Sequence, residues 1–398
     1  SARCLLERLH RRWRALARGT VTRELTDVRV ALDFSPGVTQ PAGIGRYARE
    51  LARALAPLLG RDLVLFHGRV QQAYASPPEA TLRQLPLSPQ WLTRLWHRLH
   101  VPLPIELLVG HVDVVHGIDF LVPPARVPRV ATIHDLSFLI VPELGHPRLV
   151  RFLTGAVPRT LACADQIITV SEAVRADLIR LYRIDPRRVH TIHHGVNAVF
   201  RAVEGPHQTP LLASLGIRDP YILAVGTIEP RKGYPVLLRA IDRLARDMPD
   251  LQLVIVGSPG WLSDPIEAEI VAGVRCNRVV WLRSIADETL AALYRGARAF
   301  VSTSYYEGFN LPLLEALAAG TPAVVTDLSV HREVARQAAL YVGIDAPDQL
   351  AEALWRVLSE ENLAQRLRDA ARERAAQFSW TKAAELHLSV YQLAVSAR

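Results

Sequence analysis

The sequence predicts an α/β protein with two domains, each a parallel sheet wrapped by helices. Its 398 residues exceed the chain length that usually folds around a single hydrophobic core, so two domains of roughly 150 to 200 residues are expected. Short apolar runs alternate with helical patterns from Val28 to His193 and again from Tyr221 to Val342, and such alternation is typical of parallel sheets. A polar stretch with prolines, residues 199–220, separates the two series and is interpreted as a linker.

The first series brings glycines and a histidine to the ends of strands. Val28–Asp33 is an apolar strand, and Pro41–Glu50, which contains Gly43 and Gly45, opens a long helix. Glycines there let a ligand approach the backbone, but the third glycine of a dinucleotide fingerprint and the Gly-Lys-Ser/Thr of an NTPase loop are missing. His134 ends another apolar strand. A lone histidine is more often structural than catalytic, so both interpretations stay open.

Two adjacent cations follow the first strand of the second series. Tyr221–Gly226 is an apolar strand that ends at a glycine, and Arg231 and Lys232 precede the expected helix Pro235–Leu244. Paired cations at the carboxyl end of a strand, beside a helix N-terminus, suit a diphosphate because fixed charge and backbone N–H groups both meet its oxygens. A surface turn with solvated charges is the alternative.

Two glutamates flank a later loop. Ala299–Ser302 is short and apolar like a buried strand, Glu307 lies in the glycine loop after it, and Glu315 lies within the expected helix Leu311–Ala319. Ligands of open α/β sheets bind at this edge, and two carboxylates there suit a diol or the hydroxyls of a sugar. A capping glutamate followed by a solvated helix glutamate is the alternative.

Composition narrows the class of ligand. The chain has 47 lysines and arginines against 39 aspartates and glutamates, a net charge of +8, which favours phosphate-bearing ligands or an anionic surface. Nucleic acid is disfavoured because no recognition motif and no basic stripe with interleaved aromatics is present. Cys4, Cys163 and Cys276 are widely spaced, so neither a disulfide framework nor a zinc site is indicated, and a reducing cytoplasm is expected.

Two segments have the pattern of surface helices that lie on membranes. Residues 1–20 place leucines and a tryptophan at helical spacing between arginines, and Trp91–His100 repeats this pattern. Either segment could contact an anionic membrane or pack on its domain with solvated arginines. No apolar run approaches the roughly 18 to 20 residues needed to span a bilayer.

Taken together, these segments resemble the retaining glycosyltransferases of family 4, and the resemblance covers nearly the whole chain. The motifs that carry it occur in the family's order and approximate spacing. They are Gly43-Ile-Gly-Arg-Tyr, Thr132-Ile-His-Asp-Leu-Ser-Phe-Leu, His193-His-Gly-Val-Asn, Glu229-Pro-Arg-Lys-Gly and the Glu-x7-Glu element of Glu307 and Glu315.

The resemblance implies the GT-B arrangement of two Rossmann-like domains with a cleft between them. The expected divisions are an amphipathic N-terminal helix at 1–20, an acceptor domain at 21–200 and a nucleotide-sugar domain at 201–378. In the family, the last helix, here 379–398, crosses back onto the N-terminal domain. Three C-terminal helices are expected at Pro347–Leu358, Glu361–Gln377 and Trp380–Ala397.

The resemblance also implies roles for individual residues. Glu315 would bind the ribose, Glu307 and the backbone after it would hold the sugar, and His134 would lie near that sugar. Arg231, Lys232 and the backbone of Gly43 to Gly45 would hold the diphosphate, and loops such as that ending at Ile285 would read the base. The full expected set is His134, Arg231, Lys232 and Glu307 as catalytic residues, and Gly43, Ile44, Gly45, Gly226, Ile285, Gly308, Phe309, Asn310, Leu311 and Glu315 as donor-binding residues.

Two departures from the family pattern stand out. Thr227 occupies a position where many members carry an arginine of the diphosphate clamp, and Asn310 occupies one where glycine is frequent. Arg231 would then complete the clamp, and the sugar pocket would be locally altered. No Asp-x-Asp occurs in the chain, so no metal site and no cofactor beyond the donor substrate is expected.

The function that follows is transfer of a hexose to a glycan or lipid-linked acceptor in bacterial polysaccharide or lipopolysaccharide synthesis. Mannose or rhamnose from a GDP-sugar is favoured, and the enzyme is expected in the cytoplasm, at the inner face of the plasma membrane. Two alternatives stay open. One is a non-catalytic sugar-nucleotide-binding subunit, and the other is a nucleotide-sugar epimerase of the same fold.

Overall fold

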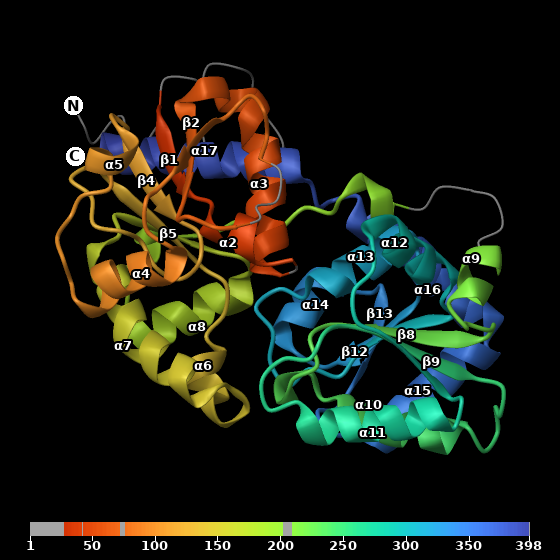
Figure 1. Cartoon of the computed structure of the whole chain (residues 1–398). Coiled ribbons are helices and arrows are strands. Elements are labelled where there is room, and N and C mark those ends of the chain that lie inside the picture. The colour runs from red at the N-terminus through yellow and green to blue at the C-terminus, as the bar shows by residue number, and fades with distance from the viewer. Residues whose placement is uncertain (1–27, 42, 72–75, 202–208, 398) are drawn as a thin grey trace. The chain divides into compact units, whose positions relative to one another are not determined.

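The computed structural model describes residues 28–41, 43–71, 76–201 and 209–397, and the expected helix at 1–20 lies outside these ranges. Contacts divide the chain into two compact units (Figure 1). Unit 1 holds the described residues up to Leu136 together with Arg151–Gly195 and the segment from Ser379. Unit 2 holds Val196–Phe378 and also Ser137–Val150, a segment that lies within the range expected for the first domain.

In unit 1 the described residues form a seven-stranded parallel sheet in the order β3-β2-β1-β4-β5-β6-β7. Its strands are β1 (Val30–Asp33), β2 (Leu63–His67), β3 (Thr81–Gln84), β4 (Val114–Gly117), β5 (Arg129–Ile133), β6 (Gln166–Thr169) and β7 (Val189–Thr191). Its helical elements are α2 (Ser35–Thr39), α3 (Ile44–Leu59), η1 (Gly60–Asp62), α4 (Pro89–Thr93), the π-helix η2 (Arg94–Arg98), α5 (Glu106–Val109), most of α7 (Pro147–Cys163), α8 (Glu172–Tyr182), η4 (Pro186–Arg188) and α17 (Trp380–Ser396).

In unit 2 the described residues form a six-stranded parallel sheet in the order β10-β9-β8-β11-β12-β13. Its strands are β8 (Tyr221–Val225), β9 (Gln252–Val256), β10 (Val279–Leu282), β11 (Ala299–Ser302), β12 (Ala323–Thr326) and β13 (Ala339–Val342). Its helical elements are α6 (Ser137–Ile140), η3 (Pro142–Leu144), η5 (Ala198–Phe200), α9 (Thr209–Ser214), η6 (Pro230–Lys232), α10 (Tyr234–Leu244), α11 (Asp264–Arg275), α12 (Asp287–Gly296), α13 (Leu311–Ala319), α14 (Ser329–Ala335), α15 (Pro347–Ser359) and α16 (Glu361–Ala375).

The inner strands of both sheets are buried, whereas the edge strand β3 is largely exposed and the edge strands β10 and β13 are partly buried. In unit 2, α10, α11 and α15 lie on one side of the sheet, and α12, α13 and α14 lie on the other (Figure 1). Every residue of β9 is buried, as expected for an apolar run in a parallel sheet covered on both sides. The fold class expected from the sequence, two Rossmann-like parallel-sheet domains, is confirmed.

The C-terminal helix α17 returns to unit 1. Val390 and Tyr391 of α17 belong to the same apolar core as Leu51 and Leu55 of α3. Burial of these side chains holds the last helix against α3, so the return of the chain expected for the final segment is observed.

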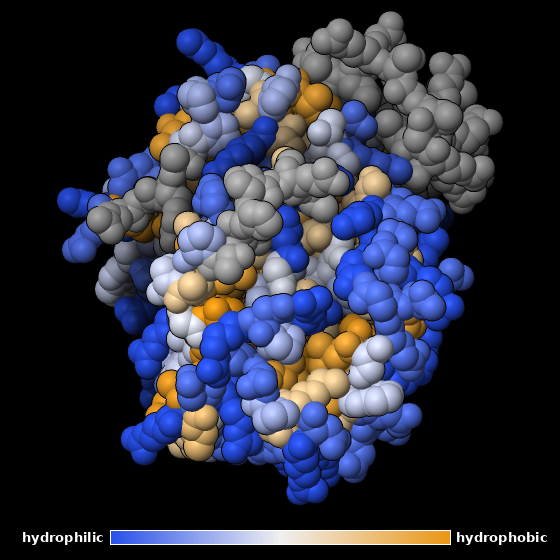
Figure 2. Space-filling model, turned by 90° about the vertical axis from the view of Figure 1, so that its right-hand side faces the viewer, coloured by the Kyte–Doolittle hydropathy of each residue, from blue (hydrophilic) through white to orange (hydrophobic). Residues whose placement is uncertain are grey.

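The outer surface is mainly polar. Figure 2 shows a face on which hydrophilic residues predominate and apolar residues gather in a few places between them. Exposed ion pairs such as Arg298 with Asp219 and Arg278 with Asp242 lie on unit 2. Pairs of this kind contribute little to stability, so each unit is stabilised mainly by its own buried core.

Candidate active site

The charged residues singled out from the sequence lie at the point in the sheet of unit 2 where the strand order reverses. β8 and β11 are neighbours, and from them the strand order runs outward through β9 and β10 on one side and through β12 and β13 on the other. Open α/β sheets bind ligands at the carboxyl ends of strands at such a switch point. The loop after β8 carries Arg231 and Lys232, and the loop after β11 carries Glu307.

Lys232 and Glu307 form a buried ion pair between these two loops. Lys232 Nζ lies 2.5 Å from Glu307 Oε1, and the two side chains are 17% and 7% exposed. Ser304 Oγ donates a hydrogen bond of 2.7 Å to the same carboxylate oxygen. An ammonium has three N–H donors, so one carboxylate does not exhaust its capacity to bind phosphate oxygens.

Arg231 joins the two loops from the other side of the carboxylate. Its Nη1 donates to Glu307 Oε2 at 3.0 Å and to the Tyr306 carbonyl at 2.8 Å, and its Nη2 lies 2.6 Å from Glu229 Oε1. The sequence assigned Arg231 the same phosphate-binding role as Lys232. In the structure, several N–H groups of the guanidinium donate hydrogen bonds to acceptors within the protein. Arg231 therefore has a structural role as well.

The carboxylate of Glu307 is ionised at neutral pH. Burial alone would raise its pKa, but Lys232 and Arg231 outweigh burial and hold the pKa well below its usual range. Glu307 offsets one of the two positive charges, whereas burial raises the pKa of Glu229. The site therefore offers N–H donors that the two loops hold in fixed directions.

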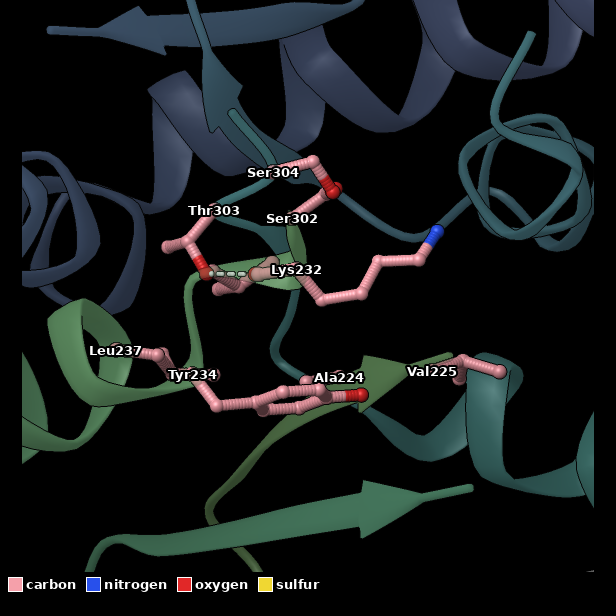
Figure 3. A pocket seen from close by; sticks show the side chains of 9 residues that line it. Ala224, Val225, Lys232, Tyr234, Leu237, Ser302, Thr303 and Ser304 are labelled. Atoms are coloured by element: carbon pink, nitrogen blue, oxygen red, sulfur yellow. Dashed lines mark hydrogen bonds between the residues drawn. The ribbon is translucent and has the colours of Figure 1, made fainter. Parts of the chain in front are cut away.

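A glycine fixes the distance between the two loops. Gly233 has a φ of +65°, and a Cβ there would lie 2.3 Å from the Thr303 carbonyl oxygen, so a side chain would push the β11 loop away. Thr303 Oγ1 donates to the Lys232 carbonyl at 2.9 Å. Figure 3 shows the Lys232 side chain running across the pocket between the ring of Tyr234 and the serine and threonine of the β11 loop.

Glu315 lies one turn into α13 and is buried. Its Oε2 accepts a hydrogen bond of 3.0 Å from the hydroxyl of Tyr294, a fully buried residue of α12. The tyrosine thus fixes the orientation of the carboxylate from inside the domain. An oriented carboxylate can accept two hydrogen bonds from one diol.

Asn310, flagged in the sequence because it replaces a frequent glycine, has left-handed backbone angles, φ 69° and ψ 69°, at the N-cap of α13. Asparagine is among the few residues other than glycine that adopt this conformation readily. Its Nδ2 lies 2.9 Å from Nε2 of the buried His331. Sequence reasoning missed His331, because nothing near it in the chain marks its contact with a residue 21 positions away.

In unit 1, the glycine turn and two aspartates lie at the corresponding switch point, between β1 and β4. A Cβ on Gly45 would lie 1.9 Å from the Gln40 carbonyl oxygen, so this glycine is required by the turn itself. Gln40 Nε2 donates to Asp119 Oδ2 at 3.4 Å. Burial, together with the nearby charge of Asp33, raises the pKa of Asp119 to about 7. No motif near Asp33 or Asp119 in the sequence predicts that the two aspartates lie close together.

His134 lies at the end of β5 in unit 1 and is buried. Its Nε2 donates to the Ile118 carbonyl at 2.7 Å, and its ring meets the ring of Tyr47 edge to face at 4.9 Å. Burial lowers the pKa of His134 to about 4. At neutral pH the imidazole is therefore uncharged, with its orientation set by the chain around it.

Family models match both halves of the chain. The model described as Glycosyltransferase Family 4 matches residues 41–200, and the one described as Glycosyl transferases group 1 matches residues 212–374. Over 369 residues the chain is 30% identical to O-antigen chain mannosyltransferase B of Escherichia coli, covering 88% of this chain and 96% of that protein. The chain belongs to glycosyltransferase family 4.

Other comparisons agree with this assignment. The glycosyltransferase is 30% identical over 406 residues to alpha-maltose-1-phosphate synthase of Mycolicibacterium smegmatis, covering 92% of this chain and 99% of that protein. Its fold is similar to that of sucrose-phosphate synthase from Thermosynechococcus elongatus, with a TM-score of 0.73, 22% identity, and coverage of 94% and 100%. The resemblance drawn from the sequence motifs is confirmed at the level of family and fold.

The remaining expected donor-binding residues of the glycosyltransferase differ in their surroundings. Gly226 lies close to Lys232, since a Cβ on it would be 3.6 Å from Lys232 Cε. Phe309 is buried, and its ring packs edge to face on Phe378. Any contact of Phe309 with the nucleotide sugar would therefore come from its backbone and not from its ring. Ile285 lies in the loop after β10, two strands away from β8 in the sheet. Gly308 and Leu311 flank Phe309 and Asn310 at the start of α13, and Ile44 is the first residue of α3.

The described residues contain neither a metal-binding cluster nor a membrane-spanning helix. Residues 28–41, 43–71, 76–201 and 209–397 contain no group of three or more His, Cys, Asp or Glu side chains placed to hold a metal ion. Within the same ranges, every helix is too short or too polar to cross a membrane.

Proposed function

We propose that this glycosyltransferase moves a hexose from a nucleoside diphosphate sugar to an acceptor hydroxyl with retention of anomeric configuration. The observation that carries the proposal is the buried Lys232–Glu307 pair at the switch point of unit 2, directly before α10. A fixed ammonium beside a helix N-terminus suits the oxygens of a diphosphate.

In this proposal, Lys232 stabilises the leaving group. As the glycosidic bond breaks, negative charge grows on the diphosphate, and a donor already held in place stabilises that charge without reorganising. Glu307 holds the ammonium in this way, and Ser304 in turn holds the Glu307 carboxylate. Lys232 would interact with more negative charge in the transition state than in the ground state. Its removal should therefore lower turnover more than it weakens donor binding.

The two glutamates of the motif would then have different tasks. Glu315, oriented by Tyr294, would accept hydrogen bonds from the ribose hydroxyls of the donor. Glu307 would lie between the cations and the transferring sugar, and the backbone from Gly308 to Leu311 would hold that sugar. His134 of unit 1, neutral and oriented by Ile118, would serve the donor sugar as a hydrogen-bonding group rather than as a cation.

For the donor we propose mannose or rhamnose carried by GDP, and for the acceptor a glycan or lipid-linked glycan of bacterial polysaccharide synthesis. The 30% identity to an O-antigen mannosyltransferase supports this choice. Equal identity to a maltose-1-phosphate synthase means that identity does not single out one sugar, so a panel of donors is the appropriate test.

The test incubates the enzyme with GDP-mannose, GDP-rhamnose, UDP-glucose and ADP-glucose, each with and without mannose oligosaccharide acceptors. Release of GDP that depends on acceptor, with an axial linkage in the product by NMR, is expected. Consumption of donor without acceptor would support the epimerase, and binding without turnover of any donor would support the non-catalytic subunit.

We also propose that transfer needs no divalent metal. The support is the pair of cations at the diphosphate site and the lack of an Asp-x-Asp motif. Activity should persist in a chelator, and activity that disappears there and returns with magnesium or manganese would contradict the proposal.

A peripheral contact with an anionic membrane at the cytoplasmic face is proposed for the segment around α4. Trp91 and Leu99 are 55% and 68% exposed, and the Arg94 guanidinium lies 4.9 Å from the Trp91 ring centroid. Trp96, the second tryptophan of this segment, is buried in unit 1. Binding to vesicles that contain phosphatidylglycerol should weaken in Trp91→Ala, and unchanged binding would contradict the contact.

A further inference from the structure

Asn310 keeps its left-handed backbone through three contacts of its side chain. Its Oδ1 accepts from the backbone N–H of Leu313 at 3.2 Å, and its Nδ2 donates to Ser302 Oγ at 3.0 Å and to His331 Nε2 at 2.9 Å. The backbone N–H of Leu313 can only donate, so it fixes which end of the amide faces His331. An alanine at this position would lose these contacts and strain the backbone.

His331 comes from a different part of unit 2 and is fully buried in α14, with 0% of its surface exposed. Its Nδ1 donates to the Thr326 carbonyl at 2.7 Å, and a carbonyl can only accept. Nε2 of the neutral ring therefore carries a lone pair and accepts from Asn310. The tautomer and the amide orientation determine each other.

These bonds continue to the cation of the diphosphate site. Ser302 Oγ lies 3.4 Å from Ser304 Oγ, and Ser304 donates to Glu307 Oε1, which Lys232 also contacts. A largely buried chain of polar side chains thus runs from α14 through the β11 loop to Lys232. Chains of this kind hold their members more rigidly than isolated pairs do.

We propose that His331 is a positioning residue for sugar transfer, which acts through Asn310 to hold the loop from Gly308 to Leu311 in its sugar-binding conformation. The inference rests on the proposed function and deepens it. His331 touches Asn310 rather than the donor, so its effect should be seen on the sugar part of the donor and not on the nucleotide. A purely structural histidine would instead lower stability without changing donor recognition.

The test compares wild type, His331→Leu, Asn310→Gly and the double variant, with Kd for GDP and for GDP-mannose and with kcat. In His331→Leu the Kd for GDP-mannose should rise about tenfold, as expected for one lost buried hydrogen bond, while the Kd for GDP changes less than about twofold. Glycine adopts the left-handed conformation without support from a side chain. In the Asn310→Gly background, His331→Leu should therefore raise the Kd for GDP-mannose by less than about twofold. His331→Gln, which keeps an acceptor, should recover part of the loss.

A second pair of variants keeps the test independent of the folding of His331→Leu. Asn310→Ala should raise the Kd for GDP-mannose at least about threefold more than Asn310→Gly does, because only glycine adopts the left-handed backbone without strain. Unchanged GDP-mannose binding in folded His331→Leu, or equal losses in both backgrounds, would overturn the positioning role alone. Failure of wild type to bind or use any nucleotide sugar would overturn the proposed function, and the positioning role with it.

Discussion

At the scale of single residues, the chemistry of Lys232 stands out against the composition of the chain. Of the 47 lysines and arginines, only Lys232 and Lys382 are lysine. An ammonium is a compact charge with three rotatable donors, whereas a guanidinium is a planar fork. In a protein that otherwise uses arginine, a lysine at the switch point indicates a site whose geometry a guanidinium does not satisfy.

We expect Lys232→Ala to lower kcat by about a hundredfold, or on the order of 3 kcal/mol in the barrier, with a smaller change in donor Kd. Lys232→Arg keeps the charge but not the shape, so it should also lose most of its turnover. Lys382→Arg, on α17, is the matched control and should retain activity. Steady-state kinetics and calorimetric binding measure the two quantities, and unchanged turnover in folded Lys232→Ala would exclude this role.

The two carboxylates give a second prediction at this scale. GDP keeps the ribose but lacks the sugar, so Glu315→Gln should weaken GDP binding by about tenfold, since one charge-assisted hydrogen bond contributes roughly 1.5 to 3 kcal/mol. Glu307→Gln should leave GDP binding largely intact and depress kcat even at saturating donor, because Glu307 is proposed to face the transferring sugar, which GDP lacks. If instead Glu307→Gln weakens GDP binding and Glu315→Gln does not, the roles are reversed.

At the scale of elements, a buried polar network joins α3 and α17 in unit 1. The Tyr47 hydroxyl lies 2.9 Å from His387 Nε2 and 3.2 Å from Thr132 Oγ1. His116 continues the network, with Nε2 2.8 Å from the same threonine and Nδ1 2.8 Å from the hydroxyl of Tyr391. The network connects the helix that follows the glycine turn with the C-terminal helix.

This network makes unit 1 sensitive to acid. Burial lowers the pKa of His134 and His387 to about 4, and it also holds the pKa of His116 and of His194 well below the usual range. Below the ordinary histidine pKa of 6.5, these four side chains bind protons in the unfolded chain but stay neutral in the folded protein. Each of them therefore lowers the free energy of unfolding by roughly 1.4 kcal/mol per pH unit, down to its folded pKa. Asp33 and Asp119, whose pKa values burial raises, act in the opposite direction but are fewer.

The free energy of unfolding, measured by urea titration, should therefore be lower at pH 5 than at pH 7. The variant His387→Gln serves as the control, since it removes one of the four groups and should flatten the dependence. Equal or greater stability at pH 5 would contradict the assignment of these histidines as buried and neutral.

Element boundaries were largely predictable from the sequence. The helices expected at Leu311–Ala319 and Pro347–Leu358 are observed as α13 and α15, the second one residue longer. The expected strand Val28–Asp33 is β1 from Val30. Apolar runs and capping residues are local signals, which is why they suffice here. In the segment Trp91–His100 the sequence left both membrane contact and packing on the domain open. Trp96, within the π-helix Arg94–Arg98, is buried, whereas Trp91 is exposed.

At the scale of the whole molecule, the two parallel sheets and the residues at their switch points could be predicted, but the partners of those residues could not. Lys232 and Glu307 are 75 residues apart, and Asn310 and His331 are 21 apart, so only the fold brings each pair together. The sequence assigned both cations to the ligand, whereas the structure shows Arg231 holding Glu229, Glu307 and a backbone carbonyl. The assignment of the diphosphate to Lys232 stays a prediction.

The most direct test of the diphosphate site uses the scarcity of lysine. The intact enzyme is treated with an amine-reactive acetylating reagent, with and without saturating GDP, and modification of Lys232 and Lys382 is quantified by mass spectrometry. GDP should protect Lys232 several-fold and leave Lys382 unchanged, because the diphosphate would occupy the ammonium of Lys232 alone. Equal modification of Lys232 with and without GDP, under conditions where calorimetry shows GDP bound, would contradict the account.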